Sequence, residues 1–118
     1  MTLREKRVLF TSLIARLVEH VATTNRYECA LNEVLRDPRV AALNAKSGKG
    51  IKKSNHIVGL AADVMLYDMM KPKGKEYCET TLEHQWLGAW WVRQHPLCRW
   101  GGDWGDGNHY SFEHEGVR

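Results

Sequence analysis

Two stretches of this 118-residue chain combine histidine and aspartate in apolar or glycine-rich surroundings. The first, SNHIVGLAAD at residues 54–63, sets His56 and Asp63 seven positions apart. Gly59 between them permits a sharp bend, so a histidine in a loop can fold back onto an aspartate in the following strand. The second, DGNHYSFEH, offers His109 at the start of a predicted strand. Because catalytic zinc usually takes three protein ligands and keeps a fourth position for water, these three side chains are candidate zinc ligands.

Asp106 is a candidate general base. It precedes His109 by three positions within the glycine-rich loop GGDWGDGN, where a carboxylate could reach a metal-bound water without itself being a ligand. The spacing alone leaves simpler interpretations open. A histidine beside a glycine is often a hydrogen-bonded loop residue, Asp63 could belong to a turn or strand end, and Asp106 could form an Asx turn.

Both stretches resemble the motifs of a known peptidase family. SNHIVGLAAD matches the SxHxxGxAxD motif of the VanY-like D-alanyl-D-alanine carboxypeptidases and L-alanyl-D-glutamate endopeptidases, and DGNH matches their later acid-x-x-His element. The two motifs occur in the family's order, with 46 positions from Asp63 to His109. The flanking segments SGKGIKKSNH and WGGDWGDGNH are similar to the compact phage endolysins of this group, so the resemblance covers roughly residues 28–114.

The resemblance implies that the three candidate ligands bind zinc and that Asp106 is the catalytic base of a peptidoglycan peptidase. It also implies an upstream arginine that grips a substrate carboxylate, and the segment EVLRD places Arg36 at the matching position. That match is weaker, because the family often has threonine or serine after the arginine and this chain has Asp37. An exposed arginine at a helix start therefore remains an open interpretation of Arg36.

Ser54 and Trp104 are further candidates for the substrate-binding site. We interpret the Ser54 hydroxyl as orienting the His56 loop by hydrogen bonding rather than as a nucleophile, because no histidine is placed to activate it outside the metal site. Trp104 flanks the glycine-rich loop, where it could form a wall of the active site. The remaining histidines, at positions 20, 84, 95 and 114, are interpreted as structural residues on helix surfaces, at a helix end or late in the last strand.

The local patterns predict an α+β fold in which about three helices pack against a small antiparallel sheet, and the resemblance implies the hedgehog/DD-peptidase arrangement. The capping boxes TLRE and TTLE predict helices over about residues 3–22 and 81–94, and Asp37–Pro38 predicts the start of a short helix between them. The strand candidates are ECALNEVL, AADVMLYDM and HYSFEH, whereas the glycines of GGDWGDGN predict an irregular loop. The buried stripe of the later helix is predicted to comprise Leu82, Trp86 and Trp90.

The length predicts a single domain over residues 1–118. The resemblance implies that this is a catalytic domain; we expect no separate wall-binding domain, and we expect a monomer. The three cysteines are far apart and lack CxxC spacing, which favours a reducing compartment over a disulfide framework. We find no export signal and no apolar run near the roughly 20 residues of a membrane-spanning helix, so we expect synthesis in the host cytoplasm without membrane insertion. The net charge of +3 mildly favours an anionic partner such as the cell wall, but the basic residues are too scattered to indicate nucleic-acid binding.

These observations predict a phage endolysin that hydrolyses the peptidoglycan stem peptide with zinc. The L-alanyl-D-glutamate bond is favoured, because the carboxypeptidase branch more often shows glutamate followed by His-Trp, whereas here DGNH is followed by Tyr110. A D-Ala-D-Ala carboxypeptidase on the same site is the alternative. A non-catalytic, zinc-containing wall-binding module is a second alternative. Such a module would be recognised by a retained set of zinc ligands without the general base. A His-Asn-His nuclease would need a further ligand histidine and a basic groove, neither of which the sequence offers.

Overall fold

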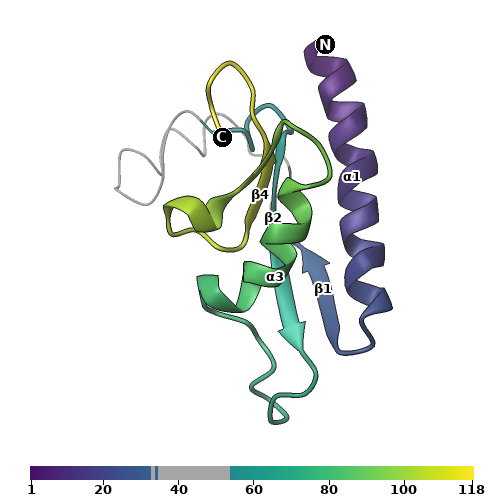
Figure 1. Ribbon diagram of the computed structural model, residues 1–118, viewed down its shortest axis with the longest axis vertical. Coiled ribbons are helices and arrows are strands. Elements are labelled where there is room, and N and C mark those ends of the chain that lie inside the picture. Colours follow the sequence, from purple (N-terminus) through teal and green to yellow (C-terminus); the bar gives the residue numbers. More distant parts are fainter. Residues whose placement is uncertain (33, 35–53) are drawn as a thin grey trace.

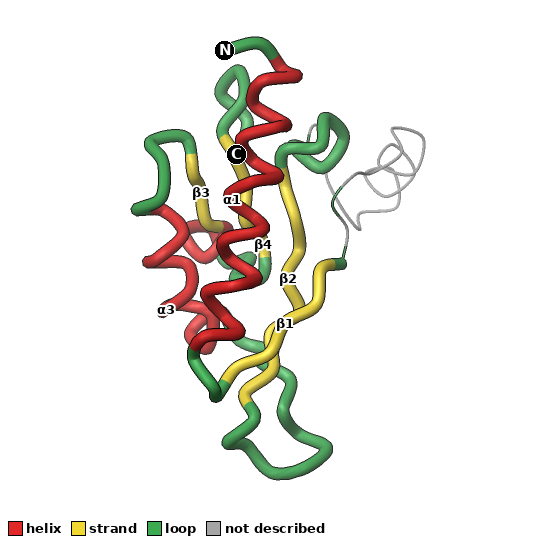
Figure 2. Tube along the Cα trace, turned by 90° about the vertical axis from the view of Figure 1, so that its right-hand side faces the viewer, coloured by secondary structure: helices red, strands yellow, loops and turns green. Residues whose placement is uncertain are grey.

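The computed structural model describes residues 1–32, 34 and 54–118. In these ranges the chain forms α1 (Leu3–Thr23), β1 (Tyr27–Leu31), β2 (Ala61–Asp68), α3 (Thr81–Val92), β3 (Cys98–Trp100), the short 3-10 helix η1 (Gly101–Trp104) and β4 (His109–Phe112). The strands form a four-stranded antiparallel sheet in the order β1-β2-β4-β3. Figures 1 and 2 show α1 and α3 together on one face of this sheet. The predicted α+β class is therefore confirmed.

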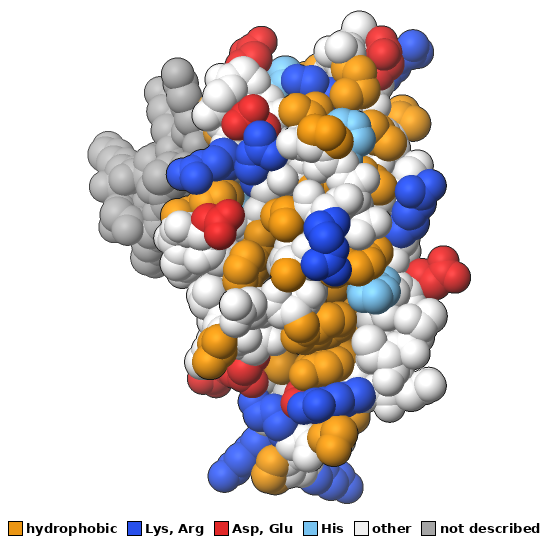
Figure 3. Space-filling view, in the orientation of Figure 1, with side chains coloured by type: hydrophobic (Ala, Val, Ile, Leu, Met, Phe, Trp, Pro, Cys, Tyr) orange, Lys and Arg blue, Asp and Glu red, His pale blue; other side chains and the backbone are white. Residues whose placement is uncertain are grey.

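The described part of the chain contains two α-helices, where about three were predicted. The short helix predicted from Asp37–Pro38 lies outside the described residues. Neither α1 nor α3, the two α-helices of the described ranges, has the length and hydrophobicity that a membrane-spanning helix requires. On the side of the molecule seen in Figure 3, apolar side chains gather along the middle, and Lys and Arg side chains occur at several separate places.

Both long helices begin at the threonines predicted to cap them. The Thr2 hydroxyl accepts a hydrogen bond from the Glu5 backbone N–H (3.1 Å), and Thr80 with Glu83 forms a complete capping box. The predicted buried stripe of α3 is wrong, since Leu82 is 75% exposed. Apolar residues occur on most sides of this helix, so their spacing did not single out the buried side. The residues that α3 buries are His84, Leu87, Gly88 and Trp91.

β2 separates the hydrophobic core from an open face of the sheet. Val64 and Leu66 are fully buried and belong to the core that the helices cover. Asp63, Met65 and Tyr67 alternate with them and are only partly buried. Because successive side chains of a strand point to opposite faces, these three residues lie on the face away from α1 and α3.

The strands differ from the prediction in their bounds and in their number. β1 ends at Leu31, although the predicted segment continues to residue 35, and β4 ends at Phe112 rather than at residue 114. β3 was not predicted, because a strand of three residues is too short to show alternation. The loop predicted to be irregular contains η1 at its start.

Candidate metal centre

The pairing of β2 with β4 brings Asp63 and His109 together. Their Cα atoms are register partners, so both side chains extend from the same face of the sheet. Oδ1 of Asp63 lies 4.0 Å from Nδ1 of His109. The backbone on either side is held by hydrogen bonds from Val64 N–H to the Asn108 carbonyl (2.9 Å) and from Asn32 N–H to the Asp63 carbonyl (2.8 Å).

A tight turn places His56 beside Asp63. The His56 backbone N–H donates to the Ser54 hydroxyl (3.2 Å), which is the hydrogen bond that the sequence led us to expect. Gly59 donates its N–H to the His56 carbonyl (3.3 Å) and has a φ of 72°, a left-handed conformation that glycine adopts without steric cost. The predicted bend at Gly59 is therefore confirmed. Nε2 of His56 lies 3.2 Å from Oδ1 of Asp63.

Asn55 anchors this turn to the rest of the fold. Its side chain is buried, and its amide group donates to the carbonyls of Phe112 and Val117. Its backbone carbonyl accepts a hydrogen bond from Leu60 N–H (2.7 Å). Breaking these contacts would leave a buried amide without hydrogen bonds, which is energetically costly. They therefore tie the His56 turn to the end of β4 and to the segment that follows it.

His56, Asp63 and His109 form a cluster that could hold a metal ion. One ligand atom from each side chain lies within 4.8 Å of the other two. Ligand atoms around a tetrahedral zinc lie roughly 3.3 Å apart, given zinc–nitrogen bonds of about 2.0–2.1 Å, so small side-chain adjustments would suffice. The two imidazoles are 3% and 7% exposed and the carboxylate is 19% exposed. Two imidazoles and one carboxylate are a donor set that suits zinc.

Asp106 lies at the rim of this cluster, on the loop between η1 and β4. Its Oδ2 is 3.9 Å from Nδ1 of His109, and its side chain is 52% exposed. Its N–H donates to the Gly101 carbonyl (2.8 Å), and its carbonyl accepts a hydrogen bond from His109 N–H (3.1 Å). The carboxylate is thus held beside the candidate ligands and stays open to solvent, where a group that exchanges protons with water must lie.

Close packing around two glycines fixes the Asp106 loop. A Cβ atom added at Gly101 would overlap the backbone oxygen of Asp106 and would lie 2.7 Å from Cβ of His109. Trp100 donates its indole N–H to the Gly107 carbonyl (2.7 Å). From the sequence we predicted only an irregular loop for these glycines, because contacts between separate elements leave no local pattern.

The predicted substrate-binding residues fall into different positions. Trp104 is 37% exposed, and its ring centroid lies 5.5 Å from that of His109, so it stands beside the cluster. Ser54 lies in the His56 turn, with its hydroxyl engaged by the His56 backbone. Arg36 lies outside the described residues, and its role stays a prediction.

His84 differs from the surface placement that we predicted. It is only 2% exposed, and a hydrogen bond of 2.9 Å joins its Nδ1 to the Tyr110 hydroxyl. Burial lowers the pKa of His84 below its ordinary value, although hydrogen bonding to the Cys78 backbone opposes that shift. His84 therefore serves as a neutral, hydrogen-bonded residue beneath the start of α3.

Comparison with known proteins identifies the fold. No family model matches the chain, and the search of curated proteins finds no match. Among solved structures, the chain is similar to the L-Ala D-Glu endopeptidase ChiX of Serratia marcescens, with a TM-score of 0.65 and 19% sequence identity. The match covers 87% of this chain and 79% of ChiX. This chain and ChiX therefore share the same overall fold.

Proposed function

We propose that this protein is a zinc-dependent peptidoglycan peptidase that cleaves the stem peptide between L-alanine and D-glutamate. The observation that carries the proposal is the convergence of His56, Asp63 and His109, with the Asp106 carboxylate at their rim. The fold similarity to an L-Ala D-Glu endopeptidase supports the substrate class. Each motif residue that the family resemblance implies as a ligand or base belongs to this group.

His56, Asp63 and His109 would hold the zinc ion. A bound zinc supplies a Lewis acid that lowers the pKa of water to about 7 and polarises a carbonyl oxygen. The protein's own contribution is to keep the three ligands in register through the β2–β4 pairing and the Ser54–Gly59 turn. Because the two imidazoles are buried, their orientation is set before any substrate arrives.

Asp106 would act as general base and then as general acid. Its carboxylate takes the proton of the attacking water and afterwards delivers that proton to the departing amine. Its position fits this task because one edge of the carboxyl group faces His109 and the residue remains half exposed. A non-catalytic binding module on the same scaffold would have no need for a carboxylate at this point, which favours the enzyme.

Three further residues would shape or support the substrate-binding site. Trp104 would form one wall of the active site, and Ser54 would stabilise the His56 turn at the edge where substrate enters. Arg36 would hold a stem-peptide carboxylate through a bidentate pair. We further propose that the enzyme is a monomeric phage endolysin that meets peptidoglycan after its release from the host cytoplasm.

Cleavage at the end of the stem peptide, by a D-Ala-D-Ala carboxypeptidase, is the second candidate. The Asp-Gly-Asn-His base element and the following Tyr110 favour the endopeptidase.

A synthetic N-acyl-L-alanyl-γ-D-glutamyl peptide tests the proposal when it is incubated with protein that has been stripped of metal and then reloaded with zinc. The proposal predicts cleavage that chelation abolishes and zinc restores, whereas full cleavage by metal-free protein would contradict it.

A further inference from the structure

Two neighbouring hollows extend from the Asp106 loop across the surface. The first, with a volume of about 160 Å³, lies between Asp106 and the start of α3. The second, with a volume of about 410 Å³, lies between the start of α3 and the turn that carries Lys71 and Lys75. Since both hollows share part of their lining, they adjoin, and together they are called here the Tyr77 groove. The shared residues are Tyr77, Glu79 and Thr80.

The Tyr77 groove lies along the same side of β2 as the candidate metal centre. Tyr77 forms a β-bridge with Tyr67, and the two rings are 5.6 Å apart. Tyr67 follows Asp63 by four positions on one face of β2, which corresponds to about 13 Å along a strand. An extended peptide that reaches the metal centre could therefore lie over Tyr77 within about four residues.

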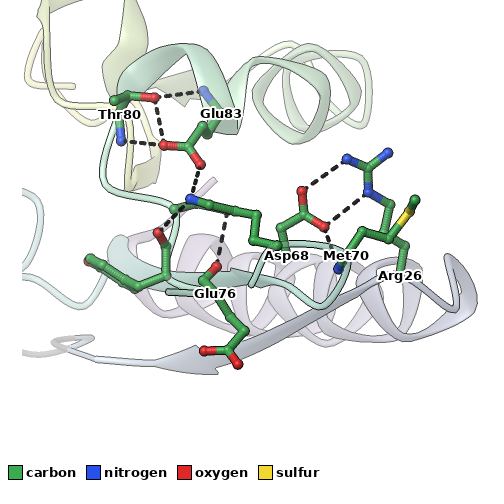
Figure 4. A network of polar contacts seen from close by, with 9 residues as sticks. Arg26, Asp68, Met70, Glu76, Thr80 and Glu83 are labelled. Atoms are coloured by element: carbon green, nitrogen blue, oxygen red, sulfur yellow. Dashed lines mark hydrogen bonds and ion pairs between the residues drawn. The ribbon is translucent and has the colours of Figure 1, made fainter. Parts of the chain in front are cut away.

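Polar contacts hold the wall between the two hollows in place. Lys71 Nζ donates to Glu83 Oε2 (2.7 Å) and to the Tyr77 carbonyl (3.0 Å), and Glu83 completes the capping box with Thr80 (Figure 4). The hydrogen bond from Lys71, assisted by that from Thr80, lowers the pKa of Glu83 to about 2. Lys71 and Glu83 thus neutralise each other, and neither is available for a charged ligand.

An exposed carboxylate, that of Glu79, lines both hollows, and the groove's cation apart from Lys71 is Lys75. Its side chain is exposed, and it makes no ion pair within the described part of the chain. Lys73, two positions earlier in the same turn, is also exposed but lines neither hollow. The two lysines differ in location and not in chemistry, so they form a matched pair for a test.

The position of Asp106 assigns the groove to one side of the scissile bond. A carboxylate that delivers its proton to the departing amine must lie on the amine side of that bond. Asp106 lines the first hollow, so the released part of the substrate would enter the groove there and continue past Tyr77.

We propose that the Tyr77 groove binds the released part of the stem peptide, with Lys75 pairing with one of its carboxylates and Tyr77 packing against its aliphatic portion. This inference rests on the proposed function. The carboxylate can belong to D-glutamate, whose α-carboxyl is free when the chain continues through the γ-carboxyl, or to the diamino acid that follows. Both sources share the chemistry that an exposed ammonium group recognises.

An NMR titration of the zinc-loaded protein with γ-D-glutamyl-meso-diaminopimelate tests the groove without requiring catalysis. The backbone amide signals of Tyr77, Glu79 and Thr80 should shift, and Lys75→Ala should weaken binding roughly three- to five-fold, as expected for a partly solvated ion pair. Lys73→Ala should leave the Kd unchanged. Equal Kd values for the two variants, or shifts confined to residues outside the groove, would overturn the proposal.

Two modified fragments identify the carboxylate. One carries a carboxamide in place of the D-glutamate α-carboxyl, and the other carries lysinamide in place of diaminopimelate, which removes both carboxylates of the diamino acid. The effect of Lys75→Ala should vanish for the fragment that lacks the paired carboxylate, and an undiminished effect with both fragments would contradict the pairing. If the groove binds the fragment but the protein cleaves no peptidoglycan, only the proposed function is refuted. Failure of the proposed function can therefore be distinguished from failure of the groove proposal.

Discussion

Asp63 and His109 are register partners across the antiparallel β2–β4 pair, with Oδ1 of the aspartate 4.0 Å from Nδ1 of the histidine. Strand pairing, rather than loop flexibility, therefore sets the distance between these two candidate ligands. His56 completes the group from a turn whose bend depends on Gly59. Since the three ligands come from separate elements, the metal centre requires the folded sheet.

Loss of any one ligand should leave an incomplete site. His56→Ala, Asp63→Ala and His109→Ala should each reduce bound zinc from about one ion per chain to a small fraction, as measured by elemental analysis after dialysis. His20→Ala removes a histidine that stacks on Trp90 outside the cluster and is the matched control. Zinc retained by all three ligand variants would place the metal elsewhere.

Asp106→Asn should separate metal binding from catalysis. The amide keeps the size and polarity of the side chain but cannot accept the proton, so kcat should fall on the order of 10²-fold or more while zinc content stays unchanged. Asp103→Asn is the control, because Asp103 is an exposed aspartate of the neighbouring η1 turn. Normal turnover by the Asp106 variant would make this residue structural, with Asp103 or Glu113 as the next candidates.

Gly101→Ala should damage the site through packing alone. The added methyl group would collide with the Asp106 backbone and with Cβ of His109, so we expect a loss of about 1–3 kcal/mol in the free energy of unfolding and weaker zinc binding. Gly105→Ala meets no neighbour but has an unfavourable φ of 82°, so it should lower stability by about 1 kcal/mol and leave zinc affinity intact. Urea unfolding and zinc titration measure both effects. Equal zinc affinities in the two variants would contradict the role of Gly101.

Buried His84 should make stability depend on pH. Its pKa is lowered in the folded state, so the unfolded chain takes up a proton first as pH falls below the ordinary value of 6.5. This contribution to stability is complete above pH 6.5 and is lost progressively as pH falls. Urea unfolding of wild type and His84→Gln between pH 7.5 and about pH 5 should show a shallower decline in the variant. If the free energy of unfolding fell in parallel with pH in the two proteins, His84 would have the same pKa in the folded and unfolded states.

The sequence predicted best those features that depend on nearby residues. The threonine caps of α1 and α3 and the bend at Gly59 arise within a few positions, and each is observed. The grouping of His56, Asp63 and His109 was also anticipated, because two motifs in the right order carry information about a shared site.

The features that escaped prediction depend on contacts between distant elements. His84 is buried because the Tyr110 hydroxyl lies beside it, although 26 positions separate the two residues. The Tyr77 groove forms where the segment after β2 approaches the Asp106 loop, and no spacing in the chain signals that approach. β3 is too short to show alternation and becomes a strand only through its pairing with β4.

We propose that a site that uses Asp106 cleaves the L-alanyl-D-glutamate bond. Mass spectrometry of the fragments that zinc-loaded protein releases from purified peptidoglycan tests it most directly, with Asp106→Asn protein as the control. We expect free stem peptides with a new D-glutamate amino terminus, L-alanine left on the glycan, and release by the variant that is slower on the order of 10²-fold or more. Release of D-alanine alone, or equal release by the variant, would contradict it.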